Sequence, residues 1–356
     1  MITPALLALS FALLQDSVHT ADSVQHGKLV AAGLETIVLE DALGNQKNLP
    51  TNQVLDIYLG AKLATLMQGE EFLAALDFQN ASASFGTAAE ENGPFWIAPW
   101  AKLRRAEALL AWCDVDPGRA GEAEGAFREW IATWPDSWWV IRARKGWGIA
   151  TALTGNVDGG ATLLQELTDF AYEKNLGRHV ELGARLTRCE IFLHGEQAPI
   201  AETRLRDLVP TIEEAAAARG VGLALRRHLQ SLLTTSQIRL GEAIELKDGT
   251  LTAAAYWNSL LGSTSSSTDA KAAAWTGIAR HAKTENRLRE AQFTLARIPA
   301  TLNAGPEVLA RALYELGEVC EQLGDNPASS TDYFKRVIEK YPRSRWAIEA
   351  QRKLGS

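Results

Sequence analysis

Histidine and cysteine are the side chains most often used for catalysis and metal binding, and in this 356-residue chain they are scattered. No two of the six histidines stand four residues apart, as a pair on one helix face would, and there is no HExxH motif. The three cysteines lack CxxC spacing and are expected to be small buried residues in helices. The sequence therefore predicts no metal ligands among His19, His26, His179, His194, His228, His281, Cys113, Cys189 and Cys320.

Motifs for phosphate, dinucleotide and acyl chemistry are also missing from the sequence. There is no GxxxxGK[ST] loop and no GxSxG, and Gly220-Val221-Gly222 lacks the third glycine of a dinucleotide fingerprint. We therefore predict no catalytic residues and no cofactor. The alternative from another class is an enzyme with a site between an N-terminal β module and the first helical hairpin. Its candidate residues are His19, Asp22, His26 and Asp56.

Composition and charge indicate a folded protein built from two different parts. The chain is 46% hydrophobic and 22% charged, which excludes a disordered chain, a collagen and a polytopic membrane protein. A net charge of −7 argues against nonspecific nucleic-acid binding. Residues 1–99 carry three lysines, no arginine and eleven acidic residues, whereas the remainder carries 33 basic and 32 acidic residues.

The N-terminus contains an apolar run, PALLALSFALL, over residues 4–14. It is too short to span a bilayer as a helix but typical of a signal-peptide core, so we expect a signal peptide over residues 1–15 and export, to the periplasm. No cysteine follows it, so no lipid anchor is predicted. No Lys or Arg precedes Lys28, and the expected cleavage region lacks a small-x-small pattern. The alternatives are a cytoplasmic protein in which this run is a buried segment, and a run that is retained as an anchor.

Residues 16–60 are predicted to form a small antiparallel β module. Short stretches rich in Val, Ile, Leu and Thr are separated by turn signals, and Asp41–Asn45 has the composition of a hairpin turn. Polar and apolar residues alternate in Glu35–Glu40. About 40 residues bury too little surface to be stable alone, so this module is expected to pack on the helices that follow.

From residue 61 to residue 356 the pattern is helical. Apolar residues recur at three- and four-residue spacing, and short breaks such as Thr154-Gly155-Asn156 and Lys247-Asp248-Gly249 divide the region into helices of about 12–20 residues. Such lengths and turns favour stacked helical hairpins over a bundle of long rods.

An internal repeat sets the fold class. The segment from Ala126 aligns with the segment from Tyr333 at an offset of 207 residues, which superposes Phe127 on Phe334, Pro135 on Pro342 and Trp139 on Trp346. A small residue, an aromatic four positions later and a proline further on resemble the tetratricopeptide repeat. The small positions recur at 81, 123, 160, 201, 253, 291 and 330.

The resemblance implies a right-handed superhelix of about seven stacked helical hairpins, a degenerate array of the kind found in bacterial envelope proteins. It implies a non-catalytic scaffold for protein–protein interaction, here expected to belong to an exported envelope or periplasmic assembly. The alternative is a cytoplasmic adaptor or regulator with the same array. Either version would bind a protein or peptide and no nucleic acid.

In this family the first helix of each hairpin lines the ligand groove. Carried over in our register, the groove positions hold five cations, and two tryptophans near the first inter-repeat turns could also face a ligand. Together they predict a positive groove suited to an acidic segment. The alternative is that these cations are solvated partners of nearby glutamates. The candidates are Lys102, Arg105, Arg142, Lys145, Arg185, Trp100 and Trp112.

Overall fold

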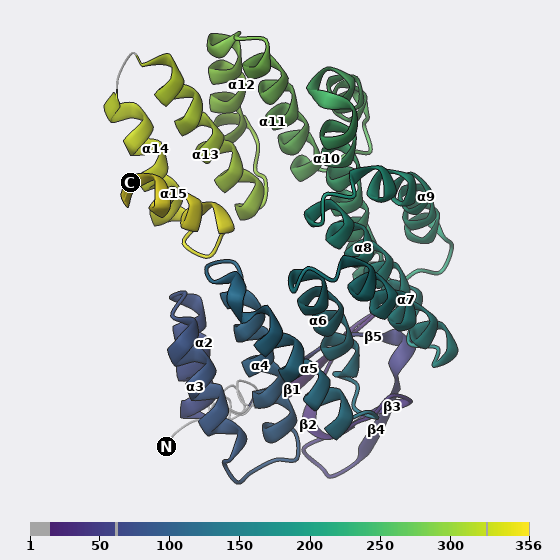
Figure 1. Ribbon diagram of the computed structural model, residues 1–356. Helices are drawn as coiled ribbons and strands as arrows, with labels where there is room; N and C mark the ends of the chain where they lie inside the picture. Colours follow the sequence, from purple (N-terminus) through teal and green to yellow (C-terminus); the bar gives the residue numbers. More distant parts are fainter. Residues whose placement is uncertain (1–14, 61–62, 325–326, 356) are drawn as a thin grey trace, which may run out of the picture. The chain divides into compact units, whose positions relative to one another are not determined.

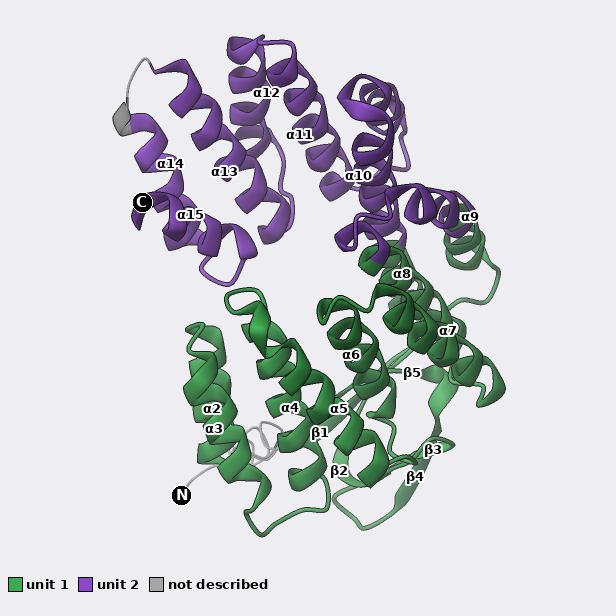
Figure 2. Cartoon of the chain, in the orientation of Figure 1, with its two compact units in different colours: residues 1–191, 210–232 green, residues 192–209, 233–356 purple. Residues whose placement is uncertain are grey.

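The structure is a computed structural model that describes residues 15–60, 63–324 and 327–355. The chain divides into two compact units (Figure 2): unit 1 contains Met1–Ile191 and Pro210–Leu232, and unit 2 contains Phe192–Val209 and Leu233–Ser356. Apart from Gln15, the expected signal peptide lies outside the described residues.

Unit 1 begins with a small antiparallel sheet, drawn in purple in Figure 1. The strand order is β4-β3-β2-β1-β5, so chain neighbours pair except where β5 returns to lie beside β1. The predicted β module is therefore confirmed. The strands are β1 (Asp16–Thr20), β2 (Val24–Ala32), β3 (Thr36–Glu40), β4 (Gln46–Pro50) and β5 (Val54–Tyr58), with a short 3-10 turn η1 (Thr51–Gln53) before β5.

Local sequence accounts for the sheet. The Asp41 carboxylate accepts hydrogen bonds from the backbone amides of Leu43 and Asn45 and so closes the β3–β4 turn, where Gly44 supplies a φ of 84°. Alternation then buries Ile37 and Leu39 of β3 on one face.

The sheet packs on the helices, as its size requires. Its buried residues belong to one core cluster with residues of the helices, among them Leu103 and Phe127. Backbone hydrogen bonds add to this packing: the Trp138 amide donates to the Ala32 carbonyl at 2.9 Å, and the amides of Ala224 and Leu225 donate to the Ala21 carbonyl.

The helices of unit 1 form antiparallel hairpins (Figure 1). Several of the second helices begin at an N-cap side chain, as when Asp77 accepts from the Asn80 amide and Asn156 from the Gly159 amide. The first hairpins are α2 (Ala64–Ala74) with α3 (Phe78–Ala89), α4 (Ile97–Trp112) with α5 (Ala120–Thr133), and α6 (Val140–Leu153) with α7 (Val157–Glu173); a 3-10 turn, η2 (Pro117–Arg119), precedes α5.

Further along the chain lie α8 (Arg178–His194), α9 (Ala198–Ala217) and α10 (Leu223–Gly262). The long α10 is two helices that meet at Gly249, whose φ of 85° and ψ of 168° are not helical. This is the break predicted at Lys247-Asp248-Gly249. Unit 2 ends with α11 (Thr268–Thr284), α12 (Leu288–Thr301), α13 (Pro306–Leu323), α14 (Pro327–Lys340) and α15 (Arg345–Gly355).

The packing of the hairpins confirms a tetratricopeptide-like helical repeat. Each small position found in the sequence is the fourth residue of a second helix, or the fourth after Gly249, and each is buried. The large residue four positions later is at most 3% exposed in every case. These positions are Ala81, Ala123, Gly160, Ala201, Ala253, Ala291 and Ser330, followed by Phe85, Phe127, Leu164, Leu205, Trp257, Leu295 and Phe334.

Glycines on the first helices make room for those large side chains. A Cβ placed on Gly69 would lie 2.6 Å from Phe85, and one on Gly317 would lie 2.7 Å from Phe334. Trp257 lies against both Gly241 and Gly277 in the same way. The glycines therefore allow the close helix crossing that each hairpin needs.

Candidate binding site

Ion pairs join successive first helices of unit 1. Glu70 on α2 accepts two hydrogen bonds of 2.6 Å from Arg104 on α4, 34 residues further along. Arg104 also pairs with Glu107, and Glu107 accepts hydrogen bonds from Arg142 on α6, 35 residues further along. The two longer spacings are close to one repeat, so Glu70–Arg104 and Glu107–Arg142 link the first helices of neighbouring hairpins.

Arg104 is held charged by these partners. Burial alone would lower the pKa of its guanidinium, but the hydrogen bonds and charges of Glu70 and Glu107 raise it above its ordinary value. A buried cation with two carboxylates is satisfied in place, so this group stabilises the stack and is not available to a ligand.

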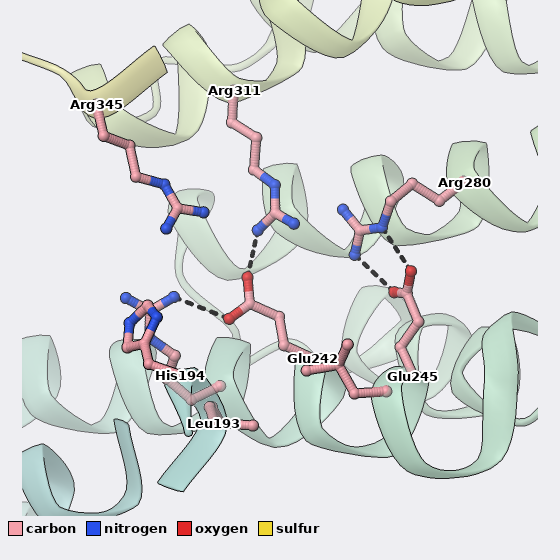
Figure 3. A pocket seen from close by; sticks show the side chains of 9 residues that line it. Leu193, His194, Glu242, Glu245, Arg280, Arg311 and Arg345 are labelled. Atoms are coloured by element: carbon pink, nitrogen blue, oxygen red, sulfur yellow. Dashed lines mark hydrogen bonds and ion pairs between the residues drawn. The ribbon is translucent and has the colours of Figure 1, made fainter. Parts of the chain in front are cut away.

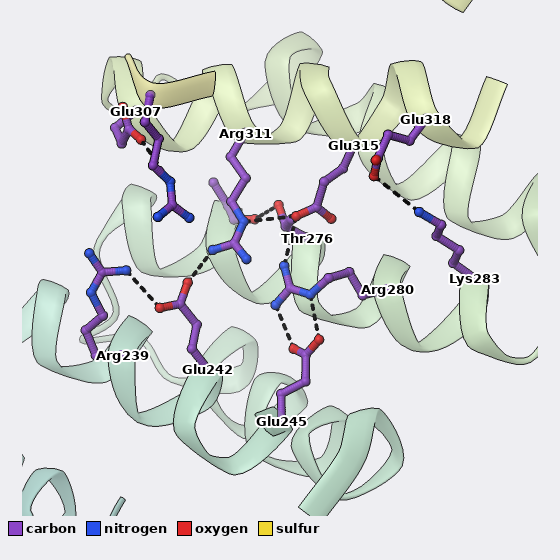
Figure 4. Close-up of polar contacts among 12 residues, drawn as sticks. Arg239, Glu242, Glu245, Thr276, Arg280, Lys283, Glu307, Arg311, Glu315 and Glu318 are labelled. Carbon is purple, nitrogen blue, oxygen red and sulfur yellow. Dashed lines mark hydrogen bonds and ion pairs between the residues drawn. The ribbon is translucent and has the colours of Figure 1, made fainter. Parts of the chain in front are cut away.

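Unit 2 contains a longer set of such pairs, which we call the charged ladder (Figure 4). Arg280 on α11 donates to both carboxylate oxygens of Glu245 on α10 at 2.7 Å and to Glu315 on α13 at 3.1 Å. Lys283 pairs with Glu318 at 3.2 Å. The residues of the ladder are Arg239, Glu242, Glu245, Arg280, Lys283, Arg311, Glu315, Glu318 and Arg345.

Glu242 lies at the centre of the ladder. It pairs with Arg311 and, at 2.8 Å, with Arg239. Burial would raise the pKa of this carboxyl group, but the two arginines lower it to about 2. Glu242 is therefore a fixed anion that orients two guanidinium groups.

A pocket of about 220 Å³ opens beside the ladder in unit 2 (Figure 3). Four arginines and two glutamates contribute most of its polar wall, and Leu193 and Leu246 contribute an apolar part. The lining residues are Leu193, His194, Arg239, Glu242, Glu245, Leu246, Arg280, Arg311 and Arg345.

Arg345, at the start of α15, differs from the other arginines of this pocket. Its Nε atom lies 4.0 Å from Glu307, which is too long for a hydrogen bond, and its side chain is 47% exposed. The guanidinium lies 4.6 Å from the centre of the Trp346 ring. Burial, followed by repulsion from Arg311, lowers the pKa of Arg345. Arg345 thus forms a longer and more exposed ion pair than the other three arginines of the pocket.

The structure shows what surrounds the groove residues predicted from the sequence. Arg142 pairs with Glu107 at 2.7 Å and lies over Trp100, and Lys102 is 3.8 Å from Glu129. Arg119 covers Trp112, with 4.2 Å between the guanidinium and the ring centre. Within the part of the chain that the structure describes, the remaining candidates have no such ion pair or ring contact: Arg105 and Lys145 are exposed, and Arg185 is half-buried. Their role in binding stays a prediction.

The pocket residues of unit 2 were not among the sequence candidates. Most of them lie in the degenerate copies, in which the repeat register is hard to read, although Arg311 belongs to the clear last copy. A usable signal was present nevertheless: Glu245, Arg280 and Glu315 alternate in charge at an interval of 35 residues, and Glu107 with Arg142 shows the same interval.

Some of the residues of the enzyme alternative do lie together. His19 on β1 is the register partner of Asp56 on β5, and His26 pairs with Ser17, so these side chains share one face of the sheet. Asp22 is exposed in the β1–β2 turn. Among the described residues, no group of three or more His, Cys, Asp and Glu side chains could hold a metal ion.

No described helix is long and apolar enough to cross a membrane.

Of the comparisons with known proteins, the one with solved structures gives matches. No protein-family model matches the chain, and no curated protein matches it. The chain is similar to NprR in complex with its cognate peptide NprX, with 14% identity, a TM-score of 0.46 and coverage of 82% of this chain and 81% of the other. It is also similar to a tetratricopeptide repeat protein from Parabacteroides merdae, with 10% identity, a TM-score of 0.45 and coverage of 77% and 91%. A third likeness is to Rap protein complexed with Competence and Sporulation Factor, with 11% identity, a TM-score of 0.41 and coverage of 80% and 77%.

Proposed function

We propose that this protein is a non-catalytic scaffold that binds a protein or peptide along the exposed faces of its first helices. The observation that carries the proposal is the pocket of unit 2, where charged side chains, most of them paired with one another, and two leucines line one recess. Such a wall offers polar and apolar contacts side by side, which is what an extended peptide needs.

A second ligand surface is proposed in unit 1. Arg105 and Lys145 are exposed cations on α4 and α6, whereas Arg104 and Arg142 are engaged with glutamates. An acidic partner segment would therefore meet Arg105 and Lys145 first. The partner-binding role of Lys102, Arg185, Trp100 and Trp112 is part of the same proposal.

The test is selection of peptides on the full chain. A display library of random peptides is panned on the immobilised protein, and the enriched peptides are measured by fluorescence polarisation. Saturable binding with no change of peptide mass after incubation is expected. If no peptide is enriched, or if the bound peptide is chemically altered, the proposal is wrong.

Charge reversal tests the contribution of unit 1. Arg105→Glu with Lys145→Glu should slow association of an acidic peptide, and the effect should shrink as salt is added. Arg128→Glu, at an exposed position of the second helix α5, is the matched control and should have little effect. If the two variants have equal effects, the first helices of unit 1 are not part of the binding surface.

We also propose that the scaffold acts outside the cytoplasm, in an envelope or periplasmic assembly. The support is the apolar run over residues 4–14. A cytoplasmic adaptor is the second candidate, favoured by the absence of Lys and Arg before Lys28. Mass spectrometry of the mature N-terminus, together with cell fractionation, decides between them. A chain beginning near Asp16 supports export, and an intact Met1 in the cytoplasmic fraction rejects it.

A further inference from the structure

We propose that the β module of unit 1 holds the starts of three successive first helices, α6, α8 and α10, and that protonation of His179 at the middle contact releases all three. The module meets the chain at the start of each of these helices, and every contact lies within unit 1. This release requires no bound partner, so it goes beyond the proposed function.

The first contact joins the module to the turn before α6. The amide of Trp138 donates a hydrogen bond to the Ala32 carbonyl at 2.9 Å. In return, the amide of Leu34 donates to the Asp136 carbonyl at 3.1 Å, and the residues between these two bonds form an antiparallel bridge. Two hydrogen bonds that flank a bridge are a unit of antiparallel ladder, so the turn is held at the end of β2 as a short strand would be.

The contact at the other end of the module is with the start of α10. The amides of Ala224 and Leu225 both donate to the Ala21 carbonyl, at 3.1 and 3.3 Å. The first amides of a helix have no partner within the helix, so the β1–β2 turn satisfies them. Gly222 allows this close approach, because a Cβ there would lie 2.3 Å from the Ala21 carbonyl oxygen and 2.1 Å from the Asp22 carboxylate.

The middle contact is made by His179, near the start of α8. Its Nε2 atom lies 3.1 Å from the carbonyl oxygen of Val54 at the start of β5, and the side chain is 5% exposed. A carbonyl oxygen can only accept, so Nε2 carries the proton of the neutral ring and Nδ1 carries none. Nδ1 is buried and has no hydrogen-bond partner among the described residues. A second proton would therefore lie on a buried nitrogen that has no acceptor, which is unfavourable.

The charged groups around His179 do not compensate for a second proton. Desolvation lowers its pKa to about 4, repulsion from His228 on α10 lowers it further, and the Val54 carbonyl raises it only in part. The two imidazole rings lie edge to face, with 5.6 Å between their centres. The pKa of His228 is itself lowered, by desolvation and by Lys145 on α6, against the opposite effect of Asp56 on β5. The docked module therefore holds His179 neutral.

Protonation of His179 favours the released form of the module. In that form the side chain is hydrated and has its ordinary pKa of 6.5, whereas in the docked form the pKa is about 4. The docked form is thus fully favoured above pH 6.5 and loses this preference as the pH falls towards 4. Between pH 7.5 and pH 5 the ratio of released to docked form should rise about thirtyfold. All three contacts belong to one small sheet, so they should open together.

Hydrogen exchange of the full chain, followed by NMR, tests the release. The reporters are the amides of Trp138 and Ala224, which donate to the module at its two outer contacts. Their protection factors, in which the intrinsic effect of pH on exchange is removed, should both fall about thirtyfold from pH 7.5 to pH 5. Both should also be smaller than the protection factor of Leu103, which is buried in α4. The proposal is overturned if the two factors do not fall, or if they equal that of Leu103, since the module would then leave only when unit 1 unfolds.

A variant that cannot take up the second proton identifies the responsible group. His179→Gln retains a donor for the Val54 carbonyl, so the fall in protection at Trp138 and Ala224 should disappear. A weaker contact in this variant would lower protection equally at both pH values and leave their ratio informative. His26→Gln, at an exposed position of β2, is the matched control and should keep the full fall. A thirtyfold fall in His179→Gln would show that another group is responsible and overturn the assignment.

A change at one end of the module tests whether the contacts act together. Gly222→Ala places a Cβ against the Ala21 carbonyl, so protection of Ala224 should fall about tenfold at pH 7.5. If the module is released as one body, Trp138 at the other end should lose as much. Gly183→Ala, inside α8 with open space around its Cβ, is the control and should leave both amides unchanged. A loss confined to Ala224, or an equal loss in Gly183→Ala, would overturn the joint release.

Discussion

Arg280 on α11 donates hydrogen bonds to both carboxylate oxygens of Glu245 on α10, each at 2.7 Å. The two side chains stand 35 residues apart and are 17% and 16% exposed, so the pair is largely withdrawn from water. Burial would lower the pKa of Arg280, but Glu315 and Glu245 raise it. This pair fixes neighbouring hairpins of unit 2 to one another and holds part of the pocket wall.

Breaking this pair should cost more stability than breaking an exposed one. Glu245→Gln leaves Arg280 with a neutral acceptor, so we expect a loss of about 3 kcal/mol in the free energy of unfolding. Glu290→Gln removes the partner of Arg287 in an exposed pair, where the loss should be about 0–1 kcal/mol. Urea unfolding followed by circular dichroism measures both. Equal losses of unfolding free energy in the two variants would mean that the Glu245–Arg280 pair contributes no more to stability than an exposed ion pair.

The packing of glycines against aromatic side chains allows a test of the close helix crossing in the repeat. Gly69→Ala places a Cβ against Phe85 and should destabilise unit 1 by about 1–3 kcal/mol. Gly125→Ala, inside α5 with open space around its Cβ, should instead stabilise by about 0.5–1 kcal/mol because alanine favours the helix. The two variants should thus shift the urea midpoint in opposite directions. A stabilising effect at Gly69 would refute the close crossing of α2 and α3.

The small position of each second helix should reject a large side chain. Ala81 is fully buried, so Ala81→Leu should overpack the crossing and cost about 1–3 kcal/mol. Ala83→Leu, two residues further along α3, is exposed and should be nearly neutral. Thermal melting of the two variants checks this difference, and a neutral result at Ala81 would show that the repeat register is wrong.

Sequence reasoning reached the fold through this register. The small residue and the large residue four positions later could be found without a structure because every hairpin buries the same face. The break at Gly249 was also predictable from Lys247-Asp248-Gly249, since glycine readily adopts the positive φ found there.

The candidate site was harder to predict than the fold. Sequence reasoning identified cations one by one and left open whether Arg142 faces a ligand groove or pairs with a nearby glutamate; in the structure Glu107 pairs with it. The pocket depends on which guanidinium pairs with each of its glutamates, and on the longer ion pair of 4.0 Å between Arg345 and Glu307. Which arginine pairs with which glutamate is decided by side-chain geometry across three or more helices, so it cannot be predicted from residue types alone.

A buried histidine links the β module to a helix and should make the stability of unit 1 depend on pH. The Nε2 atom of His179 lies 3.1 Å from the Val54 carbonyl, and burial, followed by the charge of His228, lowers the pKa of His179 to about 4. The unfolded chain binds this proton near pH 6.5, so the stabilisation is complete above that pH and is lost as the pH falls towards 4.

His179→Gln, which retains a hydrogen-bond donor, should flatten the dependence of unfolding free energy on pH between 6.5 and 4. His26→Gln, at an exposed position of β2, serves as the control and should leave the slope unchanged. Urea titrations at several pH values measure the slope. An unchanged slope in His179→Gln would refute the coupling.

Site-specific crosslinking tests the central claim, which is that a peptide binds along the first helices. Benzoylphenylalanine is introduced at Leu246, which lines the pocket and is 66% exposed, or at Phe293 on the second helix α12, which is 74% exposed. Each protein is irradiated with a peptide selected on the full chain, and adducts are quantified by mass spectrometry. The account predicts adducts from position 246 and few from position 293. Adducts confined to position 293 would contradict it.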